Sequence, residues 1–577
     1  MAIKTALIKW IAFVVSEAQQ AGTLKDVSRT QIPLEAPKKE GHGDFATTLP
    51  LLLAKVEGRS PREIATQLAK QLNDPGLRQK FEGANQPEDG FLLPTIEKLE
   101  VAGPGYINFF LTRASWHREL INILREDKNY GRASIGEESK IQIEFVSANP
   151  TGPLHVAHGR AAALGDALAR LLKSVGYQVD REYYINDVGG QMRLLGESTY
   201  LRYRELFGEE IDLPDEGYKG AYIIDIARSV MEKEGDRYMY GPAEMHLPFF
   251  ISHSYKTILG WIKRDLNTFR VHFETWTPEA EIHRENKIDA ALKLLESKKV
   301  LFEDEGALWV KTSRYGDDKD RVVRRGNRKL TYFAADIAYH QEKFERGYDR
   351  LINIWGADHH GYIARIKAVV EAMGYPPEGL QVLIHQLVNL LRDGKQIKMS
   401  KRSGEFVTLK DVIDEVGVDA TRFFFLMRRS DTSLDFDLEL AKKATNENPV
   451  FYVQYAHARV CSIERVAKDR GWDVEETVRG ITTEDLSHLT LPEEQALIKQ
   501  TSRYPELVLS AAEALEPHRI TFYLQELSGM LHRFYFGHRI ITEDTALTKA
   551  RLVLMRTVRI VLRNGLDLLG ISAPEQM

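Results

Sequence analysis

Two histidines, His155 and His158, stand three residues apart in the stretch "PTGPLHVAHGR". Prolines stiffen the chain before them, and Gly159 opens an alanine-rich segment with the composition of a helix. Imidazole groups beside a helix N-terminus can hold a polyphosphate, because the backbone N–H groups there lack intrahelical partners. Taken alone, the pattern leaves two alternatives open, a zinc-binding pair and two solvated helix-cap histidines.

A second group of charges lies in "RDGKQIKMSKRSGE", residues 392–405. Its first eleven residues hold five cations and one anion, and Gly394 and Gly404 lie on its two sides. An exposed basic turn would have the same composition. The loop follows a strand pattern at the far side of the same predicted sheet, so Lys398 and Lys401 can meet the charge that develops when a triphosphate is attacked.

These groups need a scaffold, and the chain around the histidines predicts one. "KIQIEFVS" (140–147) is typical of a buried strand, 159–177 of a helix with a leucine stripe, and 179–185 of a second strand. Strand, helix and strand in this order predict a parallel, right-handed unit. Nucleotides bind such sheets at the carboxyl ends of the strands, where both histidines fall.

A chain of 577 residues exceeds what one hydrophobic core supports, so three domains are expected. Residues 1–112 predict an α+β domain, and 113–445 a Rossmann-like α/β domain with a parallel sheet and an insertion at about 200–330. Residues 446–577 are helical throughout in pattern and predict an all-α bundle.

Composition excludes several classes of protein. With 43% apolar residues, 28% charged residues and a formal net charge of −5, the chain is expected to be soluble and is no basic nucleic-acid coat. A single cysteine, Cys461, permits no intrachain disulfide and fits a reducing cytoplasm. No stretch reaches the 18 or so apolar residues that a membrane span needs, so no membrane partner is expected.

Taken together, "HVAHG" and the downstream "KMSKR" resemble the two signature motifs of class I aminoacyl-tRNA synthetases. Within that class, "HGDFATTLP", "EFVSANPTGPLHVAHGR", "TYFAADIAYH", "WGADHHGYIARIKA" and "GLDLLGI" resemble arginyl-tRNA synthetases along the whole chain. The resemblance implies that L-arginine is activated with ATP to arginyl-adenylate and transferred to the 3′-terminal adenosine of tRNA(Arg). Ala157 replaces the usual glycine and Arg402 the usual serine, both at positions that tolerate small changes.

The resemblance also implies roles for individual residues. His155 and His158 would bind the ATP phosphates and steady the transition state, while Lys398 and Lys401 would take the β- and γ-phosphates with Mg²⁺ as counter-ion. Further ATP contacts are expected at Gly159, Gly356 and Asp358. No protein-held metal site is expected, and His359 and His360 favour core or supporting roles over metal binding.

For arginine, the resemblance implies Asn149 at the amino or carboxylate end and Glu144, Tyr332 and Asp336 at the guanidinium. The chemistry agrees, because a planar, permanently charged fork pairs best with carboxylates that accept two bonds. Glu144 would also be costly near the end of a buried strand if it had no partner. The alternative for both carboxylates is a structural ion pair with a protein arginine.

In this family the N-terminal domain touches the tRNA elbow and the helical bundle reads the anticodon. One candidate RNA surface is the last helix, where four cations fall near one side: Lys549, Arg556, Arg559 and Arg563. An ordinary solvated face would look the same. "NPVFYVQYAHAR" and "LHRFYFGHR" interleave aromatics with cations and could stack unpaired bases. The enzyme is expected to be a monomer.

Two other functions fit parts of this pattern. A small-molecule adenylyltransferase would share the nucleotide site but would not need the large helical C-terminal domain. A non-catalytic RNA-binding relative should have lost the histidines or the lysines, and both pairs are present.

Replacing a histidine or a lysine of the two motifs tests the prediction that these residues are catalytic. We expect His158→Ala or Lys401→Ala to lower the rate of arginine activation about 10²- to 10³-fold without unfolding the chain, because each group acts on charge formed in the transition state. Pyrophosphate exchange measures the rate and circular dichroism the fold. Near-normal turnover in either variant would remove that residue from the mechanism.

Overall fold

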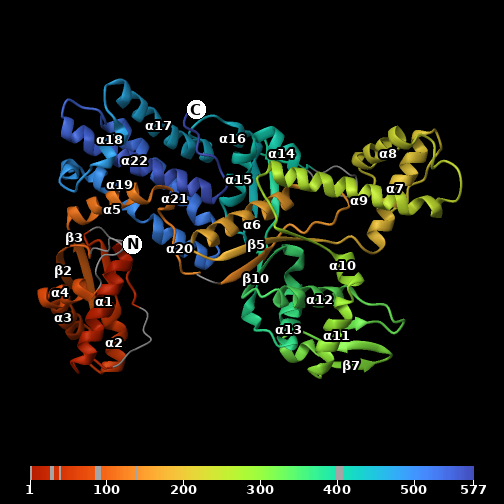
Figure 1. Cartoon of the computed structure of the whole chain (residues 1–577), viewed down its shortest axis with the longest axis horizontal. Helices are drawn as coiled ribbons and strands as arrows, with labels where there is room; N and C mark the ends of the chain where they lie inside the picture. Colours follow the sequence, from red (N-terminus) through yellow and green to blue (C-terminus); the bar gives the residue numbers. More distant parts are fainter. Residues whose placement is uncertain (1–2, 26–31, 38–40, 85–92, 137–138, 398–406) are drawn as a thin grey trace.

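The computed structural model describes residues 3–25, 32–37, 41–84, 93–136, 139–397 and 407–577. An N-terminal α+β domain, a central domain built on a parallel sheet and a C-terminal helical domain follow one another along the chain, which confirms the predicted fold class (Figure 1). Within the described ranges, no helix is both long enough and apolar enough to cross a membrane.

The central domain is organised around five parallel strands in the order β11-β10-β4-β5-β6. The strands are β4 (Lys140–Glu144), β5 (Gln178–Ile185), β6 (Thr275–Pro278), β10 (Arg350–Gly356) and β11 (Leu380–His385). Helix α6 (Val156–Ser174) lies against the face that carries Phe145, and Gly165 permits this because an added Cβ would lie 2.2 Å from the Phe145 ring. Glu144 points to the opposite face, as the alternation of a strand requires, where α12 (Tyr332–Glu345) covers it.

The range 200–330, expected as one insertion, is interrupted by a strand of the sheet. β6 lies inside it, so the chain leaves the sheet once before β6 and again after it. The first excursion forms α7 (Gly190–Leu206), α8 (Ala221–Glu234) and α9 (Ala243–Thr268), which project from the right side of Figure 1. The second forms α10 (Glu279–Arg284), α11 (Lys287–Ser297) and a small sheet of β7 (Leu301–Asp304), β8 (Ala307–Val310) and β9 (Arg321–Arg324).

The apolar run "GLQVLIHQLVNLL" divides between two sheets. Its first half is β11, while its second half, β12 (Val388–Arg392), joins β13 (Lys395–Gln396) and β14 (Leu434–Asp437). Helices α13 (Ile363–Met373), α14 (Leu409–Val416), α15 (Val418–Leu426) and α16 (Leu438–Lys442) complete the domain.

The C-terminal domain packs against this centre, and the N-terminal domain bonds the C-terminal domain through the ion pairs Lys4–Glu506 and Asp44–Lys499. The N-terminal domain has a three-stranded antiparallel sheet, and its elements are α1 (Ile3–Gln20), β1 (Phe45–Thr47), α2 (Leu49–Glu57), α3 (Pro61–Leu72), α4 (Pro75–Ala84), β2 (Ile96–Ala102) and β3 (Tyr106–Leu111). The C-terminal helices pack on α5 (Arg113–Glu126), α6 and α15, and they are α17 (Pro449–Asp469), α18 (Val474–Arg479), α19 (Pro492–Ser502), α20 (Tyr504–Ala514), α21 (His518–Gly537) and α22 (Thr545–Leu568).

A buried carboxylate joins the central domain to the bundle. Asp166 of α6 is fully buried and accepts hydrogen bonds from Arg170 (2.8 Å), Arg181 (2.7 Å) and Arg422 (2.6 Å). Arg422, also fully buried, donates in addition to the carbonyl of Leu569 after the last helix (2.9 Å). These charges hold the pKa of Asp166 below its ordinary value although burial alone would raise it.

Arg422→Met should destabilise the protein by about 3 kcal/mol, because it removes one partner of a buried ion pair and frees a buried carbonyl. Arg170→Met is the matched control, since Arg170 bonds the same carboxylate from a side chain that is 30% exposed and should cost under about 1 kcal/mol. Denaturation midpoints measure both. Equal denaturation midpoints for the two variants would contradict a role for Arg422 in joining the central domain to the bundle.

Candidate active site

The two histidines of "HVAHG" lie together at the N-terminus of α6. His155 is the N-cap residue, and the two imidazole rings stack with their centroids 3.6 Å apart. The Nδ1 atom of His158 accepts a hydrogen bond from the backbone N–H of His155 (3.3 Å). In a neutral ring this bond assigns the proton to Nε2, so His158 presents a donor from that atom.

Zinc has little support at this pair. In the described part of the chain, no three histidine, cysteine, aspartate or glutamate side chains come together as metal ligands. The helix N-terminus and its imidazole donor are suited to an anion instead.

The chain downstream of the "KMSKR" motif lies beside these histidines, while Lys398 and Lys401 themselves lie outside the described residues. Thr408 forms an isolated bridge with His155, and the N–H of Leu409 donates to the carbonyl of Leu154 (2.7 Å). The segment that follows the second motif is therefore a neighbour of the first motif in the fold.

Helix packing in this structure explains why residue 159 is a glycine. A Cβ added there would lie 2.6 Å from Leu409 and 2.9 Å from Phe425, so the missing side chain lets α14 and α15 approach α6. The resemblance implied an ATP contact at this glycine, and that contact stays a prediction.

A strained turn follows strand β4. Val146 (φ 68°) and Ser147 (φ 39°) both have left-handed backbone conformations, which are unfavourable for a β-branched residue such as valine. The hydroxyl of Ser147 donates to Glu144 Oε1 (3.0 Å), and Tyr183 bonds both backbone groups of Ala148. The turn presents Asn149 at the surface, where its side chain donates to Gln191 (2.9 Å).

Glu144 is buried in an ion pair with a residue that the sequence analysis did not single out. The ammonium of Lys343, fully buried on α12, donates to Glu144 Oε2 (2.5 Å) and to Asn353 Oδ1 (3.1 Å). The alternative expected for Glu144 was a protein arginine, and the partner is a lysine. Its charge is thus compensated within the protein, and contact with the substrate guanidinium stays a prediction.

Asp336 lies one helical turn from the start of α12, and Tyr362 donates a hydrogen bond to its carboxylate. Burial raises the pKa of Asp336 to about 7; the Tyr362 bond opposes the rise, and the nearby charges of Glu279 and Glu144 add to it. A carboxylate held in this way gains most from a cation that brings its own charge. The charge of Arg365 also lowers this pKa, though less than the Tyr362 bond does.

Glu279 is a further member of this pocket that the sequence analysis missed. It is buried as the first residue of α10, and Tyr184 hydrogen-bonds its carboxylate. Burial raises the pKa of Glu279, and burial together with the charges of Glu279, Asp336 and Glu144 raises the pKa of Tyr184 above its ordinary value, so all three carboxylates act on this tyrosine. In the sequence, Glu279 resembles an ordinary first-turn acid that complements the helix dipole.

The other predicted ligands lie around the same strand ends. Tyr332 begins α12 with 66% of its surface exposed, and its hydroxyl lies 3.3 Å from where a Cβ on Gly189 would be. Gly356 ends β10 beside His385 of β11, and the exposed Asp358 follows it. His359 pairs with Asp358 (3.5 Å). Their contacts with ATP and arginine remain predictions.

The four cations of the last helix are not a free basic face. Arg556, 8% exposed, bonds Glu464 (2.6 Å) and Glu475 (2.8 Å), and Arg559 bonds Glu464 (2.6 Å). The remaining two are also paired, Lys549 with Asp485 (2.9 Å) and Arg563 with Asp127 (2.7 Å). Each would have to leave a carboxylate to bind a phosphate, so their contact with RNA stays a prediction that the geometry does not favour.

Comparison with known families agrees with this arrangement. Residues 2–111 match the arginyl tRNA synthetase N-terminal domain, 119–460 the catalytic domain of class I (R) tRNA synthetases, and 453–577 the DALR anticodon-binding domain. The chain belongs to the arginyl-tRNA synthetase family. It is 50% identical to an arginine–tRNA ligase of Syntrophotalea carbinolica over 95% of each chain.

Solved structures of arginyl-tRNA synthetases have the same fold. A putative arginyl-tRNA synthetase of Campylobacter jejuni is 34% identical with a TM-score of 0.75, over 81% of this chain and 100% of that one. The Thermus thermophilus arginyl-tRNA synthetase is 25% identical with a TM-score of 0.74 over all of both chains. Family membership confirms the predicted aminoacyl-tRNA ligase class, and the anticodon-binding domain speaks against a small-molecule adenylyltransferase.

Asp336 should lower the free energy of unfolding at neutral pH while it strengthens the binding of arginine. Because its pKa is raised in the folded state, folding favours the protonated form, so its contribution to stability is lost as pH rises from about 4 to about 7. Asp336→Asn should therefore raise the free energy of unfolding at pH 8 by about 1–3 kcal/mol, and by about one third as much at pH 5.

Chemical denaturation without arginine at the two pH values measures this difference. In the same preparation, Asp336→Asn should weaken arginine binding at pH 8. A variant less stable than the wild type at pH 8 would contradict the raised pKa.

Proposed function

We propose that the chain activates L-arginine with ATP, releasing pyrophosphate, and transfers arginine from arginyl-adenylate to the 3′-terminal adenosine of tRNA(Arg). The observation that carries the choice of amino acid is the pocket of Glu279 and Asp336 around Tyr184. The names of the relatives, arginine–tRNA ligases at 50% identity, support the same reaction.

Glu279 and Asp336 are the carboxylates best suited to the guanidinium. Burial raises the pKa of both, so each would gain from a cation that brings its own charge. Glu144 differs because Lys343 already compensates it, so we assign it to the amino end of arginine or to support of the strained turn that presents Asn149. Tyr332, which is exposed at the start of α12, would contribute its hydroxyl to the binding of arginine.

The N-terminus of α6, which carries His155 and His158, would bind the triphosphate of ATP. The Nε2 donor of His158 and the N-terminus of α6 would stabilise charge that forms on the α-phosphate, with His155 stacked against it. Lys398 and Lys401 would take the β- and γ-phosphates, and Gly159, Gly356 and Asp358 would hold the nucleoside.

Mg²⁺ would arrive on ATP, since the described residues offer it no cluster of three ligands and it binds phosphate oxygens and waters readily. When bound, it neutralises charge on the triphosphate.

For tRNA, the aromatic surface between α17 and α21 is better suited than the paired cations of α22. The guanidinium of Arg459 lies 4.5 Å from the Tyr455 ring and 4.7 Å from the Tyr535 ring, and Phe536 is 95% exposed. Such faces stack unpaired anticodon bases. The N-terminal domain would touch the tRNA elbow.

A monomer in the cytoplasm completes the proposal. The one cysteine, Cys461, is buried and free, which suits a reducing compartment. Mass measurement in solution tests the oligomeric state.

Arginine should be preferred over citrulline and over lysine by about 10⁴ or more in kcat/KM, because a neutral or differently shaped head leaves buried carboxylates unpaired. Pyrophosphate exchange with each amino acid, with and without tRNA(Arg), measures the ratio and tests the proposed reaction itself.

Glu279→Gln and Asp336→Asn should each erode that preference. Glu281→Gln is the matched control, since Glu281 lies two residues along the same helix with a side chain 47% exposed. Comparable activation of citrulline by the wild-type enzyme would count against the pocket.

A further inference from the structure

Arg160, two residues after His158, is a buried cation without a carboxylate partner at ion-pair distance among the described residues. It is 1% exposed, and its guanidinium donates to two backbone carbonyls, those of Gln386 (2.9 Å) and Arg429 (2.8 Å). Burial lowers its pKa to about 10, so it keeps its charge at neutral pH. Burying a cation that has no paired carboxylate is costly, which indicates that the two bonds to the carbonyls have a role of their own.

The first carbonyl belongs to the chain that leads into the "KMSKR" motif. Gln386 lies between β11 and β12, two residues before β12 begins. β12 turns back as β13, and the N–H of Ile397, the residue after β13, donates to the carbonyl of Leu390 (2.8 Å). The N–H of Gln386 donates to the carbonyl of Ser430 (2.9 Å), and β14 pairs with β12. One guanidinium thus bonds the start of this hairpin and the 427–433 loop that supports it.

The downstream side of the motif is held by the same helix start. Thr408 bridges His155, and Leu409 donates to Leu154. Chain on both sides of Lys398 and Lys401 is therefore bonded to residues 154–160, upstream through the Arg160 side chain and downstream through backbone.

We infer that Arg160 is a positioning residue that sets the placement of the β12–β13 hairpin relative to His155 and His158. It acts through the two carbonyl bonds, without touching substrate. The planar guanidinium suits this task because it reaches two acceptors at a fixed angle, which an ammonium does not. A displacement of about 1 Å between groups that act on one triphosphate lowers catalysis strongly.

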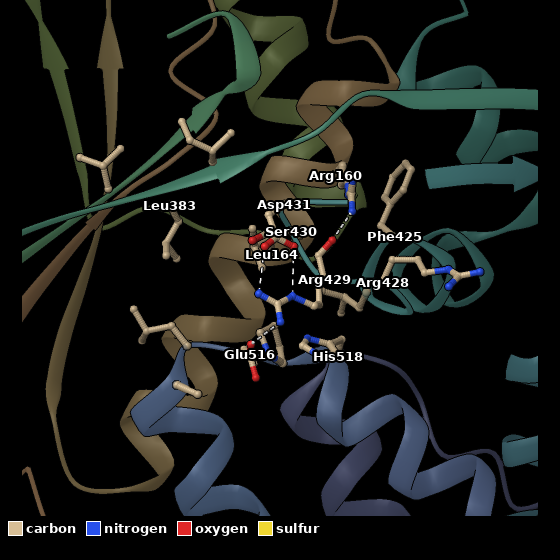
Figure 2. Close-up of a pocket in the computed structure, with 16 residues that line it drawn as sticks. Arg160, Leu164, Leu383, Phe425, Arg428, Arg429, Ser430, Asp431, Glu516 and His518 are labelled. Carbon is tan, nitrogen blue, oxygen red and sulfur yellow. Dashed lines mark hydrogen bonds and ion pairs between the residues drawn. The ribbon is translucent and has the colours of Figure 1, made fainter. Parts of the chain in front are cut away.

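The surroundings of Arg160 supply a matched control. Figure 2 shows it at the wall of a cavity of about 190 Å³ between the central domain and the bundle, with Arg428 and Arg429 beside it. The Arg429 side chain bonds Asp431 (2.9 Å) and approaches Glu516 (3.8 Å), while its carbonyl serves Arg160. Changing the Arg429 side chain therefore leaves the Arg160 bond in place.

The test compares Arg160→Met and Arg160→Lys with Arg428→Met and Arg429→Met in the full-length enzyme. Arginine-dependent pyrophosphate exchange with tRNA(Arg) gives kcat and the KM values for ATP and arginine, and thermal melting gives Tm. We expect Arg160→Met to lower kcat about 10- to 100-fold with the KM for arginine unchanged. Arg160→Lys should fall between, and both control variants should match the wild type.

Three results would overturn the inference. They are wild-type kcat in Arg160→Met, equal losses in Arg429→Met, and a parallel rise in the KM for arginine that tracks a fall in Tm. If Arg160→Met does not fold, hydrogen exchange of Arg160→Lys decides, because only residues 386–397 and the 427–433 loop, the two segments that the guanidinium bonds, should exchange faster. This inference rests on the proposed function, and a wild-type enzyme without exchange activity would contradict that proposal instead.

Discussion

The proposed active site depends on how helix α6 is held, because its start carries both motif histidines and is bonded to the chain that flanks the second motif. Polar bonds hold the helix at two levels. Near its middle, the buried carboxylate of Asp166 accepts hydrogen bonds from Arg181 of the sheet and from Arg422 of α15. At its start, Arg160 reaches the chain that precedes the second motif. Polar bonds of this kind define position more sharply than apolar packing, since they are directional and costly to leave unmade.

The proposed arginine pocket shows the opposite use of buried charge. Glu144 is paired with Lys343 of α12 and Glu182 with Arg346, which caps that helix, so both pairs fasten the helix to the strands. Asp336, on the same helix, accepts a hydrogen bond from a tyrosine hydroxyl, and no ion pair to it is found among the described residues. In the proposed function, such a carboxylate is the one that would gain most from the charge of a bound cation.

Much of this could be predicted from the chain, and the failures have a common cause. The strand–helix–strand unit follows from hydrophobic periodicity, and β4, α6 and β5 form where that pattern predicts. Glu279 was missed because a glutamate at a helix start has an ordinary explanation. The cations of α22 were singled out because spacing on one helix does not reveal that Glu464 and Asp127 lie opposite.

The amino-acid sequence by itself determined the kinds of elements, the order of the domains and the two motifs, because side-chain type and local period are properties of neighbouring residues. Only the tertiary structure decided which charges are compensated. Lys343 meets Glu144 across 199 residues, and Arg160 meets Gln386 across 226. Whether a carboxylate is paired, buried or available depends on such distances and on the loss of water around it, and neither exists until the chain has packed.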